Sequence, residues 1–118
     1  MAAALPRRPP STEGRAVRSL AQARIERALS RRARYRYVVP RVEREGRGWK
    51  VVSPNCSRNV DRSGGDIAIA WFVPLDGGHW LLHSRDHHAG CWRVEASGLT
   101  LEAALQRVCE DPLRVFWP

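Results

Sequence analysis

The sequence predicts an α+β fold, in which an antiparallel meander sheet of about five strands carries a C-terminal helix on one face and follows an arginine-rich N-terminal helix or arm. Three observations predict it. Runs of β-branched and aromatic residues separated by glycine turns fill residues 35–96, apolar residues recur at helical spacing after Gly98, and nine arginines stand against two acidic residues in residues 1–34. Because the rest of the chain carries 11 basic and 10 acidic side chains, the net charge of +8 belongs almost entirely to the N-terminal part.

This N-terminal part is predicted to lie outside the folded domain. Prolines, small residues and charge favour disorder over residues 1–13, and an arginine-rich helix or arm is expected over residues 14–34. Arg24 interrupts the apolar stripe of that helix, so its packing is expected to be shallow. An arginine-rich, acid-poor N-terminus is also typical of organelle transit peptides. The α+β domain is expected over residues 35–118, a length that suits a single core.

Five runs predict strands, at residues 35–43, 49–53, 66–74, 79–86 and 91–96. The links between neighbouring runs are mostly too short for the crossover that parallel strands need, so the sheet is expected to be an antiparallel meander. After it, Thr100 is expected to cap the C-terminal helix and Asp111 with Pro112 to end it.

The lengths of the turns predict which side chains share a face of the sheet. A two-residue turn at Asp76 and Gly77 would set Trp71 opposite Leu82, and a three-residue loop over residues 88–90 would set Ser84 opposite Val94. The face under the C-terminal helix is then expected to hold Ile69, Trp71, Val73, Trp80, Leu82, Ser84, Trp92 and Val94. Tryptophans that point inward are core residues rather than a stacking platform for bases.

The same arithmetic predicts a polar trough on the second face of the sheet, with small residues of the middle strand at its centre. Ala68, Ala70 and Phe72 are expected there beside Leu81, Cys91, Glu95 and the candidate binding residues His79, His83, Arg85, His87 and Arg93. The alternative is an ordinary solvated face of a one-sided antiparallel sheet.

A long link between the second and third predicted strands contains a cysteine and an arginine in C-x5-R spacing. Cys56 and Arg62 resemble the phosphate-binding loop of cysteine phosphatases, in which the thiolate attacks phosphorus. The loop departs from that family, because no glycine lies between the two residues and a strand follows instead of a helix. The preferred interpretation is a self-folded loop whose candidate contact residues are Cys56, Arg58, Asn59, Asp61 and Arg62.

A second cluster invites a metal interpretation. His87, His88 and Cys91 gather at one predicted turn and offer nitrogen and sulfur ligands that zinc prefers. No C-x2-C pair accompanies them, so a solvated histidine-rich turn is the preferred interpretation, and neither a metal nor another cofactor is expected.

The stretches "RYRYVVPRV", "SPNCSRNVD", "GGDIAIAWF", "RDHHAGCW" and "RVFWP" resemble a set of short proteobacterial proteins of unknown function. The resemblance covers about residues 34–118 and implies no activity, cofactor or catalytic residue. It implies only that the arginine-rich part is an extension of a self-contained domain.

Three functions follow from these observations, and the first is a non-enzymatic binding module for an unknown protein partner. The second is a nucleic-acid-binding accessory protein that acts through the arm arginines Arg24, Arg27, Arg31, Arg32 and Arg34. The third is a small thiol enzyme or zinc protein. A cytoplasmic location without membrane contact is expected, because no apolar run approaches the roughly 20 residues of a membrane span and three scattered cysteines do not make a disulfide framework.

Overall fold

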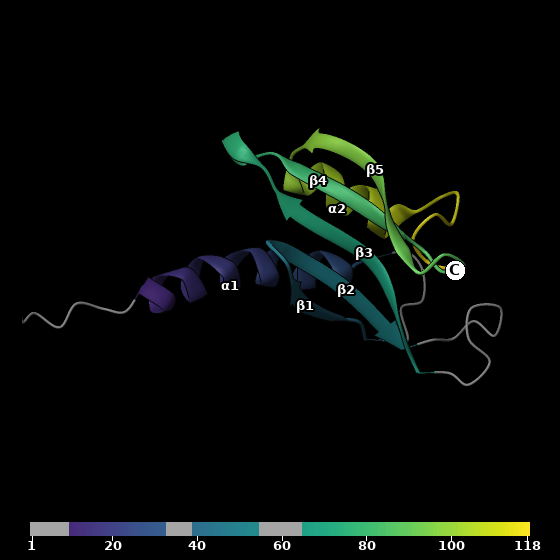
Figure 1. The fold of residues 1–118 in the computed structure, drawn as a ribbon, viewed down its shortest axis with the longest axis horizontal. Helices are drawn as coiled ribbons and strands as arrows, with labels where there is room; N and C mark the ends of the chain where they lie inside the picture. Colours follow the sequence, from purple (N-terminus) through teal and green to yellow (C-terminus); the bar gives the residue numbers. More distant parts are fainter. Residues whose placement is uncertain (1–9, 33–38, 55–64) are drawn as a thin grey trace, which may run out of the picture.

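A computed structural model describes residues 10–32, 39–54 and 65–118, and the side chains of residues 10–19 are left out of the description. It contains two helices and one five-stranded sheet (Figure 1). The elements are α1 (Pro10–Leu29), β1 (Arg41–Glu45), β2 (Gly48–Pro54), β3 (Asp66–Pro74), a short 3-10 turn (Asp76–Gly78), β4 (Trp80–Asp86), β5 (Cys91–Leu99) and α2 (Leu101–Glu110). All neighbouring strands are antiparallel and their order is β1-β2-β3-β4-β5. The predicted α+β meander is confirmed.

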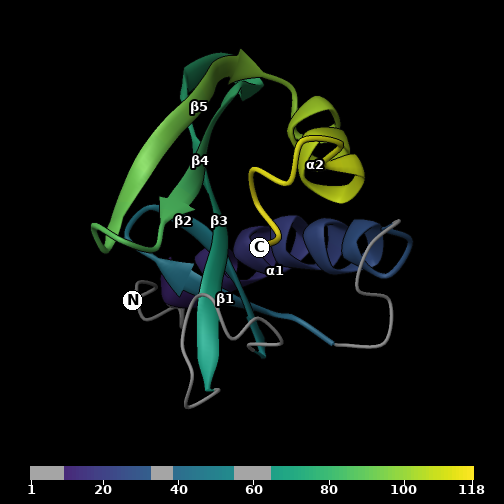
Figure 2. The same ribbon diagram turned by 90° about the vertical axis from the view of Figure 1, so that its right-hand side faces the viewer.

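Both helices lie on the same side of the sheet, as Figure 2 shows. Helix α2 turns Leu101, Ala104, Leu105 and Val108 into the core, which is the stripe that the sequence predicts. Helix α1 contributes Ile25 and Leu29, which are fully buried against the same core. The sheet side of this core consists of Val42, Trp49, Val51, Ile69, Ala70, Phe72 and Leu82. No helix in the described ranges is long and apolar enough to cross a membrane.

The two ends of α2 follow the predicted capping. The Thr100 hydroxyl accepts a hydrogen bond from the Ala103 backbone N–H, and Asp111 ends the helix in the left-handed conformation with a φ of 37°. The Asp111 carboxylate then accepts hydrogen bonds from the backbone N–H groups of Val115, Phe116 and Trp117. These bonds fold the C-terminal tail back, so that Phe116 and Trp117 become core residues.

The register of β3, β4 and β5 differs from the prediction. Trp71 pairs with His83 rather than with Leu82, and Ser84 pairs with Arg93 rather than with Val94. The reason is the length of each link. The β3–β4 link covers residues 75–79, closed by a 2.7 Å hydrogen bond from the Leu75 N–H to the His79 carbonyl, and the β4–β5 turn covers residues 87–90.

Each link shifts the pairing by one residue relative to the prediction, and one residue reverses the face of a strand. The predicted core positions of Trp71, Val73, Trp92 and Val94 are therefore wrong, because these residues share the opposite face with His83 and Arg85. Ala70 and Phe72, predicted outside, are buried under the helices. The prediction for β4 is correct, since Leu82 and Ser84 are buried. Ile69 is also buried, beside an irregularity in the pairing of β2 with β3.

Candidate functional site

The candidate site is the face of the sheet that neither α1 nor α2 covers, which we call the open face (Figure 2). One row of paired residues crosses this face through all five strands. It consists of Glu43, Lys50, Trp71, His83 and Val94. Arg85 and Trp92 pair in the same orientation beside the row. The open face therefore combines aromatic, basic and acidic side chains at adjacent positions.

An aromatic cluster of Trp71, His83 and Trp92 forms the centre of the open face. The rings of Trp71 and His83 stack with centroids 4.5 Å apart and an interplanar angle of 29°. The Trp92 ring is tilted against Trp71 at 5.6 Å and meets His83 edge-on at 6.4 Å. Offset and edge-on arrangements of this kind are the favoured geometries of aromatic pairs. The cluster thus spans three strands.

The Trp71 indole is held in place by the turn between β1 and β2. Its Nε1–H donates to the Glu45 backbone carbonyl at 2.9 Å. The next residue, Gly46, has a φ of +57°, and a Cβ at this position would lie 3.4 Å from the Trp71 ring. A glycine is favoured here by both its left-handed backbone and this close approach. The turn therefore fixes one edge of the aromatic cluster.

His83 is the member of the cluster on β4, the central strand of the three, and only 6% of it is exposed. Its Nδ1 lies 3.1 Å from the Trp71 backbone carbonyl oxygen. A carbonyl oxygen only accepts hydrogen bonds, so Nδ1 carries the proton and donates it. In the neutral imidazole Nε2 is then the unprotonated nitrogen. The histidine therefore contacts both indoles with a fixed tautomer.

The margin of the cluster is basic on one side and apolar on the other. The Arg85 guanidinium lies over the Trp92 ring, with Cζ 5.0 Å from the ring centroid, in the geometry of a cation–π contact. Val94 is 62% exposed beside it. An exposed β-branched residue next to an arginine-covered tryptophan forms a small apolar patch that solvent reaches.

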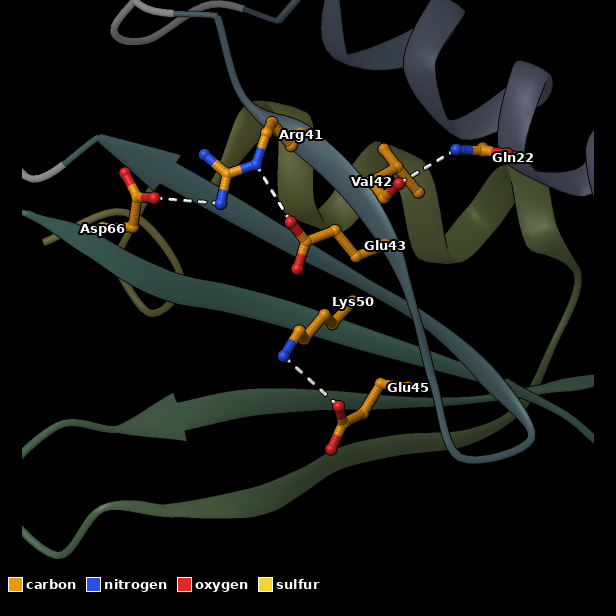
Figure 3. Close-up of polar contacts among 7 residues, drawn as sticks. All are labelled: Gln22, Arg41, Val42, Glu43, Glu45, Lys50 and Asp66. Carbon is orange, nitrogen blue, oxygen red and sulfur yellow. Dashed lines mark hydrogen bonds and ion pairs between the residues drawn. The ribbon is translucent and has the colours of Figure 1, made fainter.

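Ion pairs join charged side chains of β1, β2 and β3 (Figure 3). Arg41 lies 2.9 Å from both Asp66 and Glu43, and the Lys50 ammonium lies 3.3 Å from Glu45. The Asp66 and Glu43 carboxylates hold the pKa of Arg41 above its ordinary value. The charges around the cluster balance, because Arg41, Lys50 and Arg85 stand against Glu43, Glu45 and Asp66. The open face is not a basic surface.

The structure brings together only some of the predicted binding residues. His83 and Arg85 lie on the open face, whereas Arg93 points the other way and lies 3.9 Å from Asp86. His79 is exposed and ends the 3-10 turn before β4. His87 follows β4, where burial and then the charge of Arg85 lower the pKa of its imidazole.

The histidine–cysteine cluster and the C-x5-R loop, which could carry metal or thiol chemistry, do not contribute described residues to the open face. His87, His88 and Cys91 do not converge, and the described ranges hold no group of three His, Cys, Asp or Glu side chains arranged for a metal ion. The loop candidates Cys56, Arg58, Asn59, Asp61 and Arg62 lie outside the described residues, and so does Arg34.

Three of the arm arginines line a groove between α1 and α2. Arg24, Arg27 and Arg31 form its α1 side, and the groove has a volume of about 570 Å³. Cys109 also lines it, and burial raises the pKa of this thiol. Arg32 has a different role, because only 4% of it is exposed and its guanidinium lies over the Trp117 ring, with Cζ 5.0 Å from the centroid.

Sequence reasoning missed Trp71 and Trp92 as surface residues. Strand β3 is apolar on both faces from Ile67 to Val73, so alternation of polar and apolar residues gives no signal for its orientation. The prediction of which face each side chain occupies therefore depended on the turn lengths alone. The observed pairing across each turn differs from the predicted pairing by one residue. A partial signal was present in β2, where Lys50 interrupts the apolar residues Trp49 and Val51 and indicates an outward position.

Comparisons with known proteins place the chain in a family without assigning a function. Neither the curated proteins nor the solved structures gave a match. Residues 13–118 match the model of a family described as a domain of unknown function, DUF3024. The match includes α1 from its second turn onward, in agreement with the burial of Ile25 and Leu29 in the core. The chain therefore belongs to the DUF3024 family.

Proposed function

We propose that this protein is a non-enzymatic binding module whose open face binds a polypeptide segment of a partner protein. The observation that carries the proposal is the aromatic cluster, because two tryptophans and an arginine gather on a sheet face that no described helix covers. Trp and Arg are the side chains most enriched among residues that dominate the energy of protein interfaces. The exposed Val94 extends this group with an apolar contact.

The balanced charge of the open face favours a protein partner over a nucleic acid. A protein surface that binds nucleic acid needs a surplus of basic residues, because contacts with phosphates supply most of the affinity. Here Arg41 and Lys50 already form ion pairs with carboxylates. A rim of mixed charge around an aromatic centre is the usual anatomy of a protein interface.

The same geometry favours binding over catalysis. The His83 imidazole stacks on the Trp71 indole, meets the Trp92 indole edge-on and donates its Nδ1–H to a backbone carbonyl, so it is held as a structural group. The carboxylates of Glu43 and Glu45 on the open face form ion pairs with Arg41 and Lys50. We place the module in the cytoplasm, where Cys91 and Cys109 would stay reduced as the free thiols that the structure shows.

Nucleic-acid binding through the arm is the second candidate. The observation that favours it is that Arg24, Arg27 and Arg31 line one groove and form no ion pair with a carboxylate of the described residues. Against it, Glu102 and Glu110 line the same groove and would repel phosphates. The acidic side of the groove places this function second.

A peptide-display experiment tests the leading proposal. Random peptides are selected on the full chain, and the affinity of the selected peptides is then measured by calorimetry for the wild type, Trp92→Ala and Arg85→Ala. We expect at least about a tenfold loss for Trp92→Ala, as for the truncation of an interface tryptophan. Leu113→Ala is the matched control, since Leu113 is 83% exposed but lies in the tail after α2. Selected peptides that bind Trp92→Ala and Arg85→Ala as tightly as the wild type would refute the proposal.

A further inference from the structure

The groove between α1 and α2 has two walls of opposite charge. Its α1 wall carries Arg24, Arg27 and Arg31, and its α2 wall carries Glu102 and Glu110. Small and apolar side chains of both helices, Ala28, Leu105 and Cys109, complete the lining. The groove belongs to the helical side of the molecule, away from the open face (Figure 2).

The two walls do not neutralise each other within one chain. In the part of the chain that the structure describes, no ion pair within 4.0 Å joins an arginine of α1 to a glutamate of α2. The Glu110 carboxylate instead accepts a hydrogen bond from Gln106 on its own helix. Folding therefore leaves a positive stripe and a negative stripe side by side, each available to a charge that arrives from outside.

An exposed leucine lies on the same stripe of α1 as the arginines. Leu20 is 69% exposed and precedes Arg24 and Arg27 of α1 at intervals of four and three residues, and Arg31 lies in the turn just after α1 ends at Leu29. Residues at these intervals occupy one side of a helix. The positive stripe thus begins with one exposed apolar side chain.

We propose that the two walls of this groove form the interface of a homodimer, in which a second copy of the chain packs against them. A two-fold axis that runs parallel to the groove places the α1 wall of each protomer opposite the α2 wall of its partner. Every arginine stripe then faces a glutamate stripe. An isologous interface requires such self-complementarity, and two adjacent stripes of opposite charge provide it.

A second copy fits the groove better than the other candidates do. A nucleic acid would meet the arginines of one wall but would be repelled by Glu102 and Glu110 on the other. A uniformly acidic partner protein would meet the same repulsion. A second copy satisfies both walls, and it leaves the two open faces free. The inference is therefore independent of the function proposed for the open face.

Two charge-reversal variants of the full chain test the proposal. One variant reverses the α1 wall (Arg24→Glu, Arg27→Glu and Arg31→Glu), and the other reverses the α2 wall (Glu102→Lys and Glu110→Lys). Each variant has two walls of the same sign, so neither should dimerise. A mixture of the two should dimerise, because an all-acidic groove then faces an all-basic one. Far-UV circular dichroism confirms that both variants fold.

Sedimentation velocity at low and at high salt gives the readout. We expect the wild type to dimerise at low salt and to dissociate at high salt, each variant alone to sediment as a monomer, and the mixture to sediment as a heterodimer. A wild type that stays monomeric up to about 1 mM at low salt would overturn the proposal. So would a dimer that persists in both variants, because another surface would then form it.

A separate titration tests the nucleic-acid alternative. A fluorescently labelled single-stranded oligonucleotide is titrated with the wild type and with both variants, and its anisotropy is followed. If a monomeric wild type binds the oligonucleotide and the reversed α1 wall abolishes this binding, the groove serves nucleic acid and the homodimer is excluded. If the wild type fails to bind it while the heterodimer forms, the homodimer stands.

Discussion

Trp71 and the His83 imidazole are joined twice across β3 and β4. Their rings stack with centroids 4.5 Å apart, and the His83 Nδ1–H donates to the Trp71 backbone carbonyl at 3.1 Å. The stacking fixes the plane of the imidazole and the hydrogen bond fixes its rotation and tautomer. Trp92 closes the group from β5, so the centre of the open face is ordered before any ligand arrives.

Replacing Trp71 should destabilise the domain more than replacing an exposed neighbour. Trp71→Ala removes the stacking partner of His83 and the Nε1–H bond to the Glu45 carbonyl, and we expect a loss of about 3 kcal/mol in the free energy of unfolding. Val94→Ala is the control on the same face, with an expected change of about 0.5 kcal/mol because Val94 is largely exposed. Urea denaturation measures both. Equal losses in the two variants would show that the aromatic cluster contributes little to stability.

The tautomer of His83 can be tested with two amide variants. The side-chain NH2 of Asn approximates the position of Nδ1, and that of Gln approximates the position of Nε2. His83→Asn can therefore keep the bond to the Trp71 carbonyl, whereas His83→Gln leaves that carbonyl without its donor. We expect His83→Gln to be less stable than His83→Asn by about 1 kcal/mol in urea denaturation. The reverse order would contradict donation from Nδ1.

The arrangement of elements could be predicted from the sequence because the signals are local. Leu101, Ala104, Leu105 and Val108 recur at helical spacing, and Thr100 caps the helix with its own side chain. Short links between strands leave a meander as the simplest topology, and that is the topology observed.

The candidate site could not be predicted, because two turns decide which face of the sheet each side chain occupies. Each turn shifts the pairing of its two strands by one residue relative to the expected pairing. Trp71 and Phe72 are adjacent and both aromatic, so only the register decides which of them is buried. Arg32 is a second example. Its partner Trp117 lies at the far end of the sequence, and no local pattern connects the two residues.

The stability of the domain should depend on pH through His87. Burial, followed by the charge of Arg85, lowers the pKa of His87 below its ordinary value of 6.5 in the folded state. As the pH falls, His87 of the unfolded chain therefore binds a proton before His87 of the folded chain does. His87 leaves the free energy of unfolding unchanged above about pH 6.5. Between about pH 6.5 and the lower pKa of the folded state, it reduces that free energy. His87→Asn should flatten the decline in the urea midpoint between about pH 7 and pH 5. His79→Asn is the control, since His79 is exposed, and it should keep the decline of the wild type. An unchanged slope in His87→Asn would contradict the assignment to His87.

Asp111 should be the most sensitive polar position in the described core. Its carboxylate is almost fully buried and accepts the backbone N–H groups of Val115, Phe116 and Trp117, which hold the C-terminal tail against the helices. Asp111→Ala leaves these donors without an acceptor and also places a residue with a Cβ but no side-chain oxygen at a φ of 37°. We expect a loss of about 3 kcal/mol or more in the free energy of unfolding, whereas Leu113→Ala in the same tail should change it by about 0.5 kcal/mol.

Asp111→Asn separates the loss of the hydrogen-bond acceptor from the strain of the left-handed backbone. It keeps a residue that tolerates the left-handed conformation but turns an NH2 group toward backbone donors, so it should recover only part of the loss. If Asp111→Asn instead matched the wild type in urea denaturation, the carboxylate would not be what holds Phe116 and Trp117 in the core.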